Sequence, residues 1–119
     1  MSDDDERDRA IQPEDLSRFF VERANAGDVE GLVALYEPDA VLALPGGGIA
    51  QGAVAIRQAY EQLLATKPTF APGDQQPALR HGALALTSTR ITNGATAEVA
   101  RRQTNGTWLW IIDQPNVLA

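Results

Sequence analysis

The chain has 119 residues, a net charge of −6 and no cysteine. This length fits one domain with one modest core, and the lack of cysteine excludes disulfides and thiolate chemistry. No apolar run approaches membrane-spanning length, no basic-then-apolar leader is visible, and no basic stripe suits nucleic acid. We therefore expect a cytoplasmic protein with neither nucleic-acid nor membrane partners. Five acids among the first nine residues predict a disordered acidic tail at 1–10, followed by a single domain at 11–119.

Two helices are predicted on either side of Gly27. Pro13 suits the first position of a helix that runs to about Ala26. Gly27 suits the left-handed residue that follows a helix, and Asp28 can cap the next one. Apolar residues then recur at i, i+3, i+4 and i+7 as far as Tyr36, which predicts a second amphipathic helix.

A strand and a third helix are predicted next. Pro38 is expected to stop the second helix, and the apolar run 40–44 has the length of a buried strand. A glycine-rich turn at 45–48 leads to a short strand at 49–51. The apolar stripe of residues 53–66 predicts the third helix.

The C-terminal half is predicted to be a three-stranded meander. Asn-Gly between strand-like runs favours a tight hairpin, because type I′ turns need positive φ at both central residues. The pairs Asn93-Gly94 and Asn105-Gly106 therefore separate strands at about 83–91, 96–104 and 107–114. The order ααβαβββ, with helices segregated from an antiparallel sheet, indicates the α+β class.

Four segments carry a family resemblance: 25–36, Pro-Asp-Ala-Val at 38–41, Gly52 with Ala-Ile-Arg at 55–57, and the ending 99–115. Together they resemble the NTF2-like superfamily, and the ending resembles its SnoaL-like or DUF4440 branch. The resemblance implies three helices packed on a strongly curved antiparallel sheet that together form a cone. It further implies a small, largely apolar ligand, no cofactor, and a homodimer paired through the sheet.

Ketosteroid isomerase, a relative with known chemistry, provides a comparison. Its mechanism needs an aspartate base and an oxyanion hole of a tyrosine and a protonated aspartate. The resemblance places Phe20 at the oxyanion tyrosine, Leu44 at the base and Ala100 at the oxyanion aspartate. None of these side chains can exchange a proton, so we expect no activity by that mechanism, and a more apolar cavity.

The second Asn-Gly pair predicts which side chains share a face. With Asn105-Gly106 as a two-residue turn, one face carries Glu98, Ala100, Arg102, Leu109, Ile111 and Asp113. The opposite face carries Val99, Arg101, Gln103, Trp108, Trp110 and Ile112. The resemblance assigns the first face to the cavity, although periodicity alone allows the reverse. Trp108 and Trp110 are interpreted first as core residues or as a dimer surface; if they are exposed, we expect the dimer surface.

Glu98 and Asp113 are the candidate catalytic residues. Opposed carboxylates would have Cβ atoms ~4.5–5.5 Å apart, and one of the pair would hold its proton more tightly. The alternatives are that the pair lies in solvent, that an arginine neutralises it, or that Asp113 merely ends the strand. Asp113 otherwise needs a donor from a helix, such as a tyrosine hydroxyl. Tyr36 and Tyr60 are predicted as core residues whose hydroxyls reach a polar group.

The predicted ligand contacts are Phe20, Leu44, Tyr60, Ala100, Arg102 and Ile111. Arg102 could equally be a solvated rim residue. No cluster of side chains has the spacing of a metal site. The expected function is binding of a small apolar molecule, with isomerase, cyclase or hydrolase chemistry as an option. The alternative is a dimeric binding or interaction module without catalysis.

Overall fold

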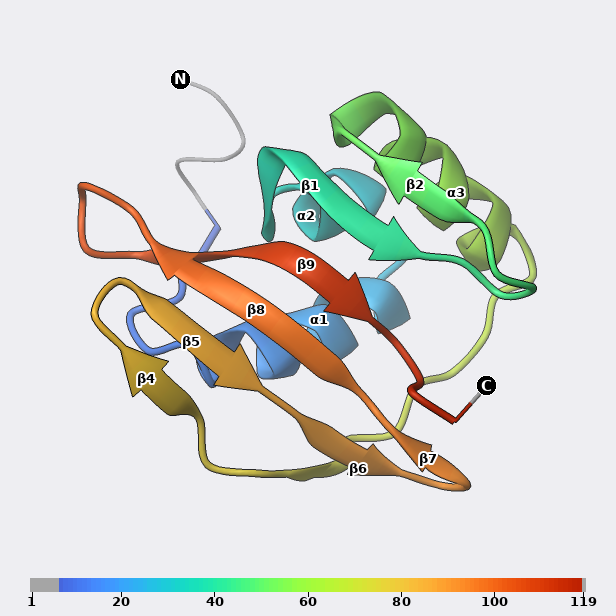
Figure 1. Ribbon diagram of the computed structural model, residues 1–119. Helices are drawn as coiled ribbons and strands as arrows, with labels where there is room; N and C mark the ends of the chain where they lie inside the picture. Colours follow the sequence, from blue (N-terminus) through green and yellow to red (C-terminus); the bar gives the residue numbers. More distant parts are fainter. Residues whose placement is uncertain (1–6, 119) are drawn as a thin grey trace.

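The computed structural model describes residues 7–118 and shows three helices packed against a curved sheet (Figure 1). The helices are α1 (Asp15–Asn25), α2 (Val29–Val33) and α3 (Ala53–Ala65). The strands are β1 (Tyr36–Ala43), β2 (Ile49–Gln51), β3 (Asp74–Gln75), β4 (Leu79–His81), β5 (Leu84–Thr87), β6 (Thr89–Ile91), β7 (Gly94–Ala95), β8 (Ala97–Arg102) and β9 (Trp108–Gln114). The predicted α+β class is confirmed.

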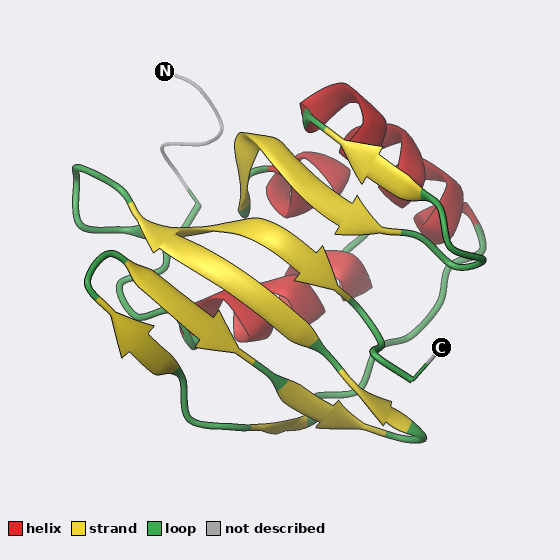
Figure 2. Cartoon of the chain, in the orientation of Figure 1, coloured by secondary structure: helices red, strands yellow, loops and turns green. Residues whose placement is uncertain are grey.

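The main sheet has the strand order β2-β1-β9-β8-β5-β4, and its neighbours are antiparallel except for β1 and β9. The predicted sheet was antiparallel throughout, so the β1–β9 pair corrects it. A second sheet, β3-β6-β7, continues from the far ends of β5 and β8 (Figure 2). The predicted strand 83–91 is thus divided between two sheets at Ser88, which is neither in β5 nor in β6.

The junction between α1 and α2 confirms the prediction made from Gly27 and Asp28. Gly27 has a φ of 71°, in the left-handed region that favours glycine. The Asp28 side chain accepts a hydrogen bond from the Gly31 N–H at 3.0 Å, as a helix cap does. The chain therefore reverses between two helices with almost no loop.

The second helix is shorter than predicted, because the chain enters the sheet at Tyr36. The helix ends at Val33, and the Leu35 carbonyl already accepts a hydrogen bond from the Trp110 N–H. Pairing with β9 overrides the helical period there. Pro38 lies inside β1 instead of before it. It sits where the β1–β9 register is irregular, between Tyr36 and Val41, which suits a residue without an N–H.

The β8–β9 hairpin corrects the predicted face assignment. Its loop has three residues instead of two. The Gln103 N–H donates to the Thr107 carbonyl, and Gly106 has a φ of 85°. The observed pairing is therefore displaced by one residue from the predicted pairing, and Arg102 faces Trp108.

An irregularity between Val99 and Ala100 restores the predicted register, because Ile111 is the extra residue on β9. Glu98 faces Asp113, as predicted. Trp108 and Trp110 turn towards the helices and are each 3% exposed, whereas Ile112 is 50% exposed. The predicted tryptophan surface is therefore wrong, because these rings belong to the core.

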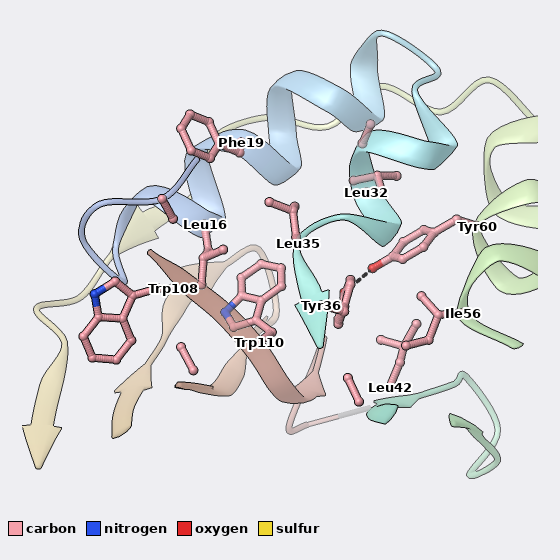
Figure 3. Close-up of a cluster of buried hydrophobic side chains, with 14 of the residues drawn as sticks. Leu16, Phe19, Leu32, Leu35, Tyr36, Leu42, Ile56, Tyr60, Trp108 and Trp110 are labelled. Atoms are coloured by element: carbon pink, nitrogen blue, oxygen red, sulfur yellow. Dashed lines mark hydrogen bonds between the residues drawn. The ribbon is translucent and has the colours of Figure 1, made fainter. Parts of the chain in front are cut away.

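The core lies between the helices and the concave side of the sheet (Figure 3). Its large members are Leu16, Phe19, Leu32, Leu35, Tyr36, Leu42, Ile56, Tyr60, Trp108 and Trp110.

Of the predicted tail at 1–10, residues 1–6 lie outside the described residues. Ala10 is buried, and its carbonyl accepts a hydrogen bond from the Trp108 N–H at 2.9 Å. Arg7 forms an ion pair with Asp28.

Candidate functional site

A cavity of about 910 Å³ lies between α1, α3 and the concave side of the sheet. Its volume is in the range of small-molecule sites. Most of its wall is apolar, with an aromatic cluster in which the Phe20 ring lies 5.4 Å from Phe70 and 6.2 Å from Tyr60. Lining residues include Ser17, Phe20, Val21, Leu42, Leu44, Ile49, Ala55, Ala59, Tyr60, Leu63, Phe70, Thr89, Ile91, Thr96, Glu98, Trp110 and Asp113.

The structure brings most of the predicted site residues to this cavity. Phe20, Leu44, Tyr60, Glu98 and Asp113 all line it. They come from α1, the end of β1, α3, β8 and β9, so five parts of the chain supply one wall. Asp113 and Glu98 are each 5% exposed, which removes the alternative that the pair lies in solvent.

Three predicted ligand residues lie elsewhere. Ala100 is fully buried in the core and is not among the cavity-lining residues. Arg102 is exposed at the hairpin end of β8, and Ile111 is half-buried at the β-bulge; neither lines the cavity. The register shift in the hairpin accounts for Ile111, because Trp110 takes the cavity face in its place. Arg102 stays on the face of β8 that carries Glu98 and Ala100, but it lies at the hairpin end, away from the cavity.

A chain of hydrogen bonds connects three side chains at the closed end of the site. The Tyr36 hydroxyl donates to Oδ2 of Asp113 at 2.5 Å, and the hydroxyls of Tyr36 and Tyr60 are 2.5 Å apart. Figure 3 shows the two tyrosines pointing towards each other from β1 and α3. The predicted tyrosine donor is therefore present, but Tyr36 comes from a strand. The sequence signal for it was obscured because Tyr36 fits the helical period.

Burial, and to a smaller extent the nearby negative charge of Glu98, raises the pKa of Asp113 to about 7. The hydrogen bond from Tyr36 acts in the opposite direction, because it stabilises the carboxylate. Burial also raises the pKa of both Tyr36 and Tyr60, so their hydroxyls keep their protons. Asp113 is thus a carboxyl group that can give or take a proton near neutral pH.

Glu98 forms a second polar group in the wall, one strand away. Thr87 donates a hydrogen bond to Oε1 of Glu98 at 2.7 Å. Burial raises the pKa of Glu98, and hydrogen bonds from Thr96 and Thr87 lower it in part. No arginine of the described chain forms an ion pair with either carboxylate. The two groups therefore influence each other's charge inside a poorly hydrated space.

The two buried carboxyl groups of the site suit acid–base chemistry. Within residues 7–118, no group of three or more histidine, aspartate or glutamate side chains is placed to hold a metal ion. In the same part of the chain, no helix is long and apolar enough to cross a membrane.

Comparison with solved structures shows the same fold in proteins of low identity. The first is a provisionally assigned calcium/calmodulin-dependent protein kinase type II association domain from Thiobacillus denitrificans (TM-score 0.74, 13% identity, 91% of this chain and 96% of that one). The second is a ketosteroid isomerase-like protein from Erwinia carotovora atroseptica (TM-score 0.67, 18% identity, 84% of this chain and 88% of that one). The third is a provisionally assigned dehydratase of the NTF2-like family from Streptomyces avermitilis (TM-score 0.70, 17% identity, 87% of this chain and 93% of that one).

Sequence comparison assigns the family. No curated protein matches the chain. The model of the SnoaL-like domain matches residues 17–113, which run from the first cavity residue of α1 to the buried aspartate of β9. The matched segment therefore contains most of α1, all of α2 and α3, nearly all of both sheets, and both buried carboxyl groups of the site. The chain belongs to the SnoaL-like domain family.

Proposed function

We propose that this protein binds a small, largely apolar molecule in its cavity and that Asp113 exchanges a proton with it. The observation that carries the proposal is a carboxyl group, 5% exposed, in a wall made mostly of aliphatic and aromatic side chains. Such a wall gives affinity for apolar surface, and the buried carboxyl of Asp113 gives a polar contact that orients the ligand.

Proton transfer is the chemistry that fits this carboxyl group best. A catalytic acid or base works best when its pKa lies near the operating pH, and the pKa of Asp113 is about 7. Glu98 faces Asp113 across the strands, so the protonation of Asp113 depends on the charge of Glu98. Isomerisation and dehydration, the reaction classes named for two of the solved structures, both require such a transfer. This supports an isomerase-like, cyclase-like or hydrolase-like reaction.

Binding is tested with 2-tetralone, a neutral bicyclic ketone, by quenching of tryptophan fluorescence, since Trp110 lines the cavity. Ala59→Trp would place an indole in the cavity from α3, and we expect it to weaken binding at least 10-fold. The matched control is Val54→Trp, on the same helix but 66% exposed, which should bind like the unmodified protein. Equal binding by both variants would contradict the proposal.

A second proposal concerns self-association, which the alternative of a binding module also requires. One row of apolar side chains crosses the convex side of the sheet, from strand to strand in register: Leu79, Leu86, Val99, Ile112 and Val41. Leu79, Leu86 and Ile112 are 69%, 46% and 50% exposed. We propose that a second copy of the chain covers this row, because so continuous an apolar surface is unusual on a monomer.

A further inference from the structure

Residues 66–73, which we call the strap, connect α3 to β3 and form part of the cavity wall. In Figure 1 the strap runs in yellow-green from the end of α3 towards β6. Its inner residues line the cavity: Thr66, Phe70, Ala71 and Gly73. Its outer residues do not line the cavity and are exposed: Lys67, Thr69 and Pro72. The strap is therefore a single layer of chain between the cavity and the solvent.

One side chain from the end of α1 holds the middle of the strap. The Phe70 N–H donates a hydrogen bond to Oδ1 of Asn25 at 2.8 Å, and Nδ2 of Asn25 donates one to the Phe70 carbonyl at 2.9 Å. The Asn25 carboxamide thus satisfies both backbone groups of Phe70, as a neighbouring strand would. Within residues 7–118, these are the only hydrogen bonds that residues 68–73 make with the rest of the chain.

The ends of the strap are fixed more firmly than its middle. Lys67 has a φ of 50°, a strained value for a residue other than glycine, and its N–H donates to the Leu64 carbonyl at 3.0 Å, which closes α3. Gly73 lies directly against β6, because a Cβ at this position would be 2.5 Å from the Arg90 carbonyl oxygen. Movement of the strap is therefore confined to the residues between these two points, and Phe70 is at their centre.

The Phe70 ring is the part of the strap that packs into the cavity wall. It meets the Phe20 ring edge-on, with 5.4 Å between the ring centroids and 77° between the ring planes. Asn25 is exposed, so water competes for its two hydrogen bonds and their net strength is small. Breaking these bonds and the ring contact would free the strap without disturbing a helix or a sheet.

We propose that the strap is a gate of the cavity, that Phe70 is the group that moves, and that Asn25 is the positioning residue that keeps the gate closed. This inference rests on the proposed function, because a gate matters only if the cavity takes up a ligand. Asn25 holds the strap but does not line the cavity. It therefore controls how fast a small apolar ligand enters and leaves, and not how tightly the ligand is bound.

The gate can be tested without a ligand, because the chain has no cysteine. Ala59→Cys places a single thiol in the cavity wall on α3, and the rate of its reaction with DTNB reports how often the cavity opens. Adding Asn25→Ala should raise this rate about 10-fold, because two exposed hydrogen bonds are lost. The matched control is Val54→Cys, on the same helix but at a position 66% exposed, where Asn25→Ala should leave the rate unchanged.

A third thiol separates a gate from a general loss of stability. Ala100→Cys lies in the core and outside the cavity wall, so only unfolding of the domain exposes it. Asn25→Ala should leave its rate unchanged. An equal rise in the rates of Ala59→Cys and Ala100→Cys would overturn the gate, and so would an unchanged rate of Ala59→Cys.

A double-mutant comparison tests whether Phe70 is the moving group. Phe70→Ala should by itself raise the DTNB rate of Ala59→Cys, because the ring no longer closes the wall. Asn25→Ala should then add less than 2-fold, since both changes act on the same element. Effects of Asn25→Ala and Phe70→Ala that multiply independently would contradict this assignment.

Ligand exchange is measured by stopped-flow quenching of tryptophan fluorescence with 2-tetralone. Asn25→Ala should raise kon and koff about 10-fold each and change Kd less than 2-fold. A weaker Kd with an unchanged kon would make Asn25 a residue for affinity and would overturn the gate.

The two proposals fail in different ways. If 2-tetralone does not bind the unmodified protein, the proposed function fails, whereas the thiol rates still decide whether the strap opens. If 2-tetralone binds but Asn25→Ala leaves the rate of Ala59→Cys unchanged, the gate fails and the proposed function remains.

Discussion

Replacing Asp113 with asparagine should stabilise the protein, and by an amount that depends on pH. In the fold, the pKa of Asp113 is about 7, against an ordinary value of 3.8. Between these two pH values the native state holds a proton that the unfolded chain has lost. The stabilisation from that proton is fully present below pH 3.8 and is lost as the pH rises towards 7.

The size of the effect follows from the pKa difference. Each pH unit in this window removes ~1.4 kcal/mol from the free energy of unfolding, which over the whole window amounts to ~4 kcal/mol. Asparagine has nearly the same shape and cannot ionise. The difference in stability between Asp113→Asn and the unmodified protein should therefore grow from pH 4 to pH 7 and then stay constant.

Urea unfolding at several pH values measures this difference, with the emission of Trp108 and Trp110 as the signal, since both rings are 3% exposed in the fold. Titrating groups that do not interact with Asp113 are common to both proteins and cancel in the comparison. The matched control is Asp39→Asn, an exposed aspartate on β1, for which we expect no such growth. A flat difference between pH 4 and 8, or a less stable Asp113→Asn at pH 8, would refute the reasoning.

The remaining predictions concern the sheet surface, the core and one turn. Ile112→Asp should convert the dimer into a 12.8 kDa monomer in light scattering, whereas Val54→Asp, at an exposed position of α3, should remain dimeric. Monomeric masses for both variants would contradict the proposed interface. Ile56→Ala, at a fully buried position of α3, should lower the free energy of unfolding by ~2–5 kcal/mol in urea, with Val54→Ala within ~0.5 kcal/mol. Gly52→Ala should cost ~1–3 kcal/mol by the same measurement, because Gly52 has a φ of 88°, and Gly48→Ala should cost less.

The fold could be predicted because its strongest signals are local. Gly27 and Asp28 mark a helix end and a helix start by backbone geometry alone, and the structure has both. Tyr36 shows where such reasoning fails. It completes a helical apolar period, yet pairing with Trp110 of β9, far along the chain, holds it in the sheet. Competition between a local period and a distant partner cannot be judged from one sequence.

Only part of the candidate site could be predicted, because its strand register depends on details of a loop and a bulge. Glu98 and Asp113 face each other as expected, but only because the β-bulge at Ile111 reverses the slip made by the three-residue hairpin loop. Between the loop and the bulge, Trp108 and Trp110 therefore take the concave face that the prediction gave to Leu109 and Ile111. Asn-Gly is compatible with loops of two or three residues, and a one-residue difference turns every side chain of a strand to the other face.

The parallel pairing of β1 with β9 has a consequence for how the protein acquires its structure during synthesis. Strand β9 lies between β1 and β8, so in the main sheet the strands of the helical half join those of the meander through it. Contacts between segments this far apart in sequence form slowly, because a long loop must close before any contact compensates for it. A nascent chain that has not reached Trp108 exposes the apolar faces of α1 and β1. The emerging protein should therefore depend on chaperones until its last strand is made, and truncation before Asp113 should leave an aggregation-prone fragment rather than a smaller domain.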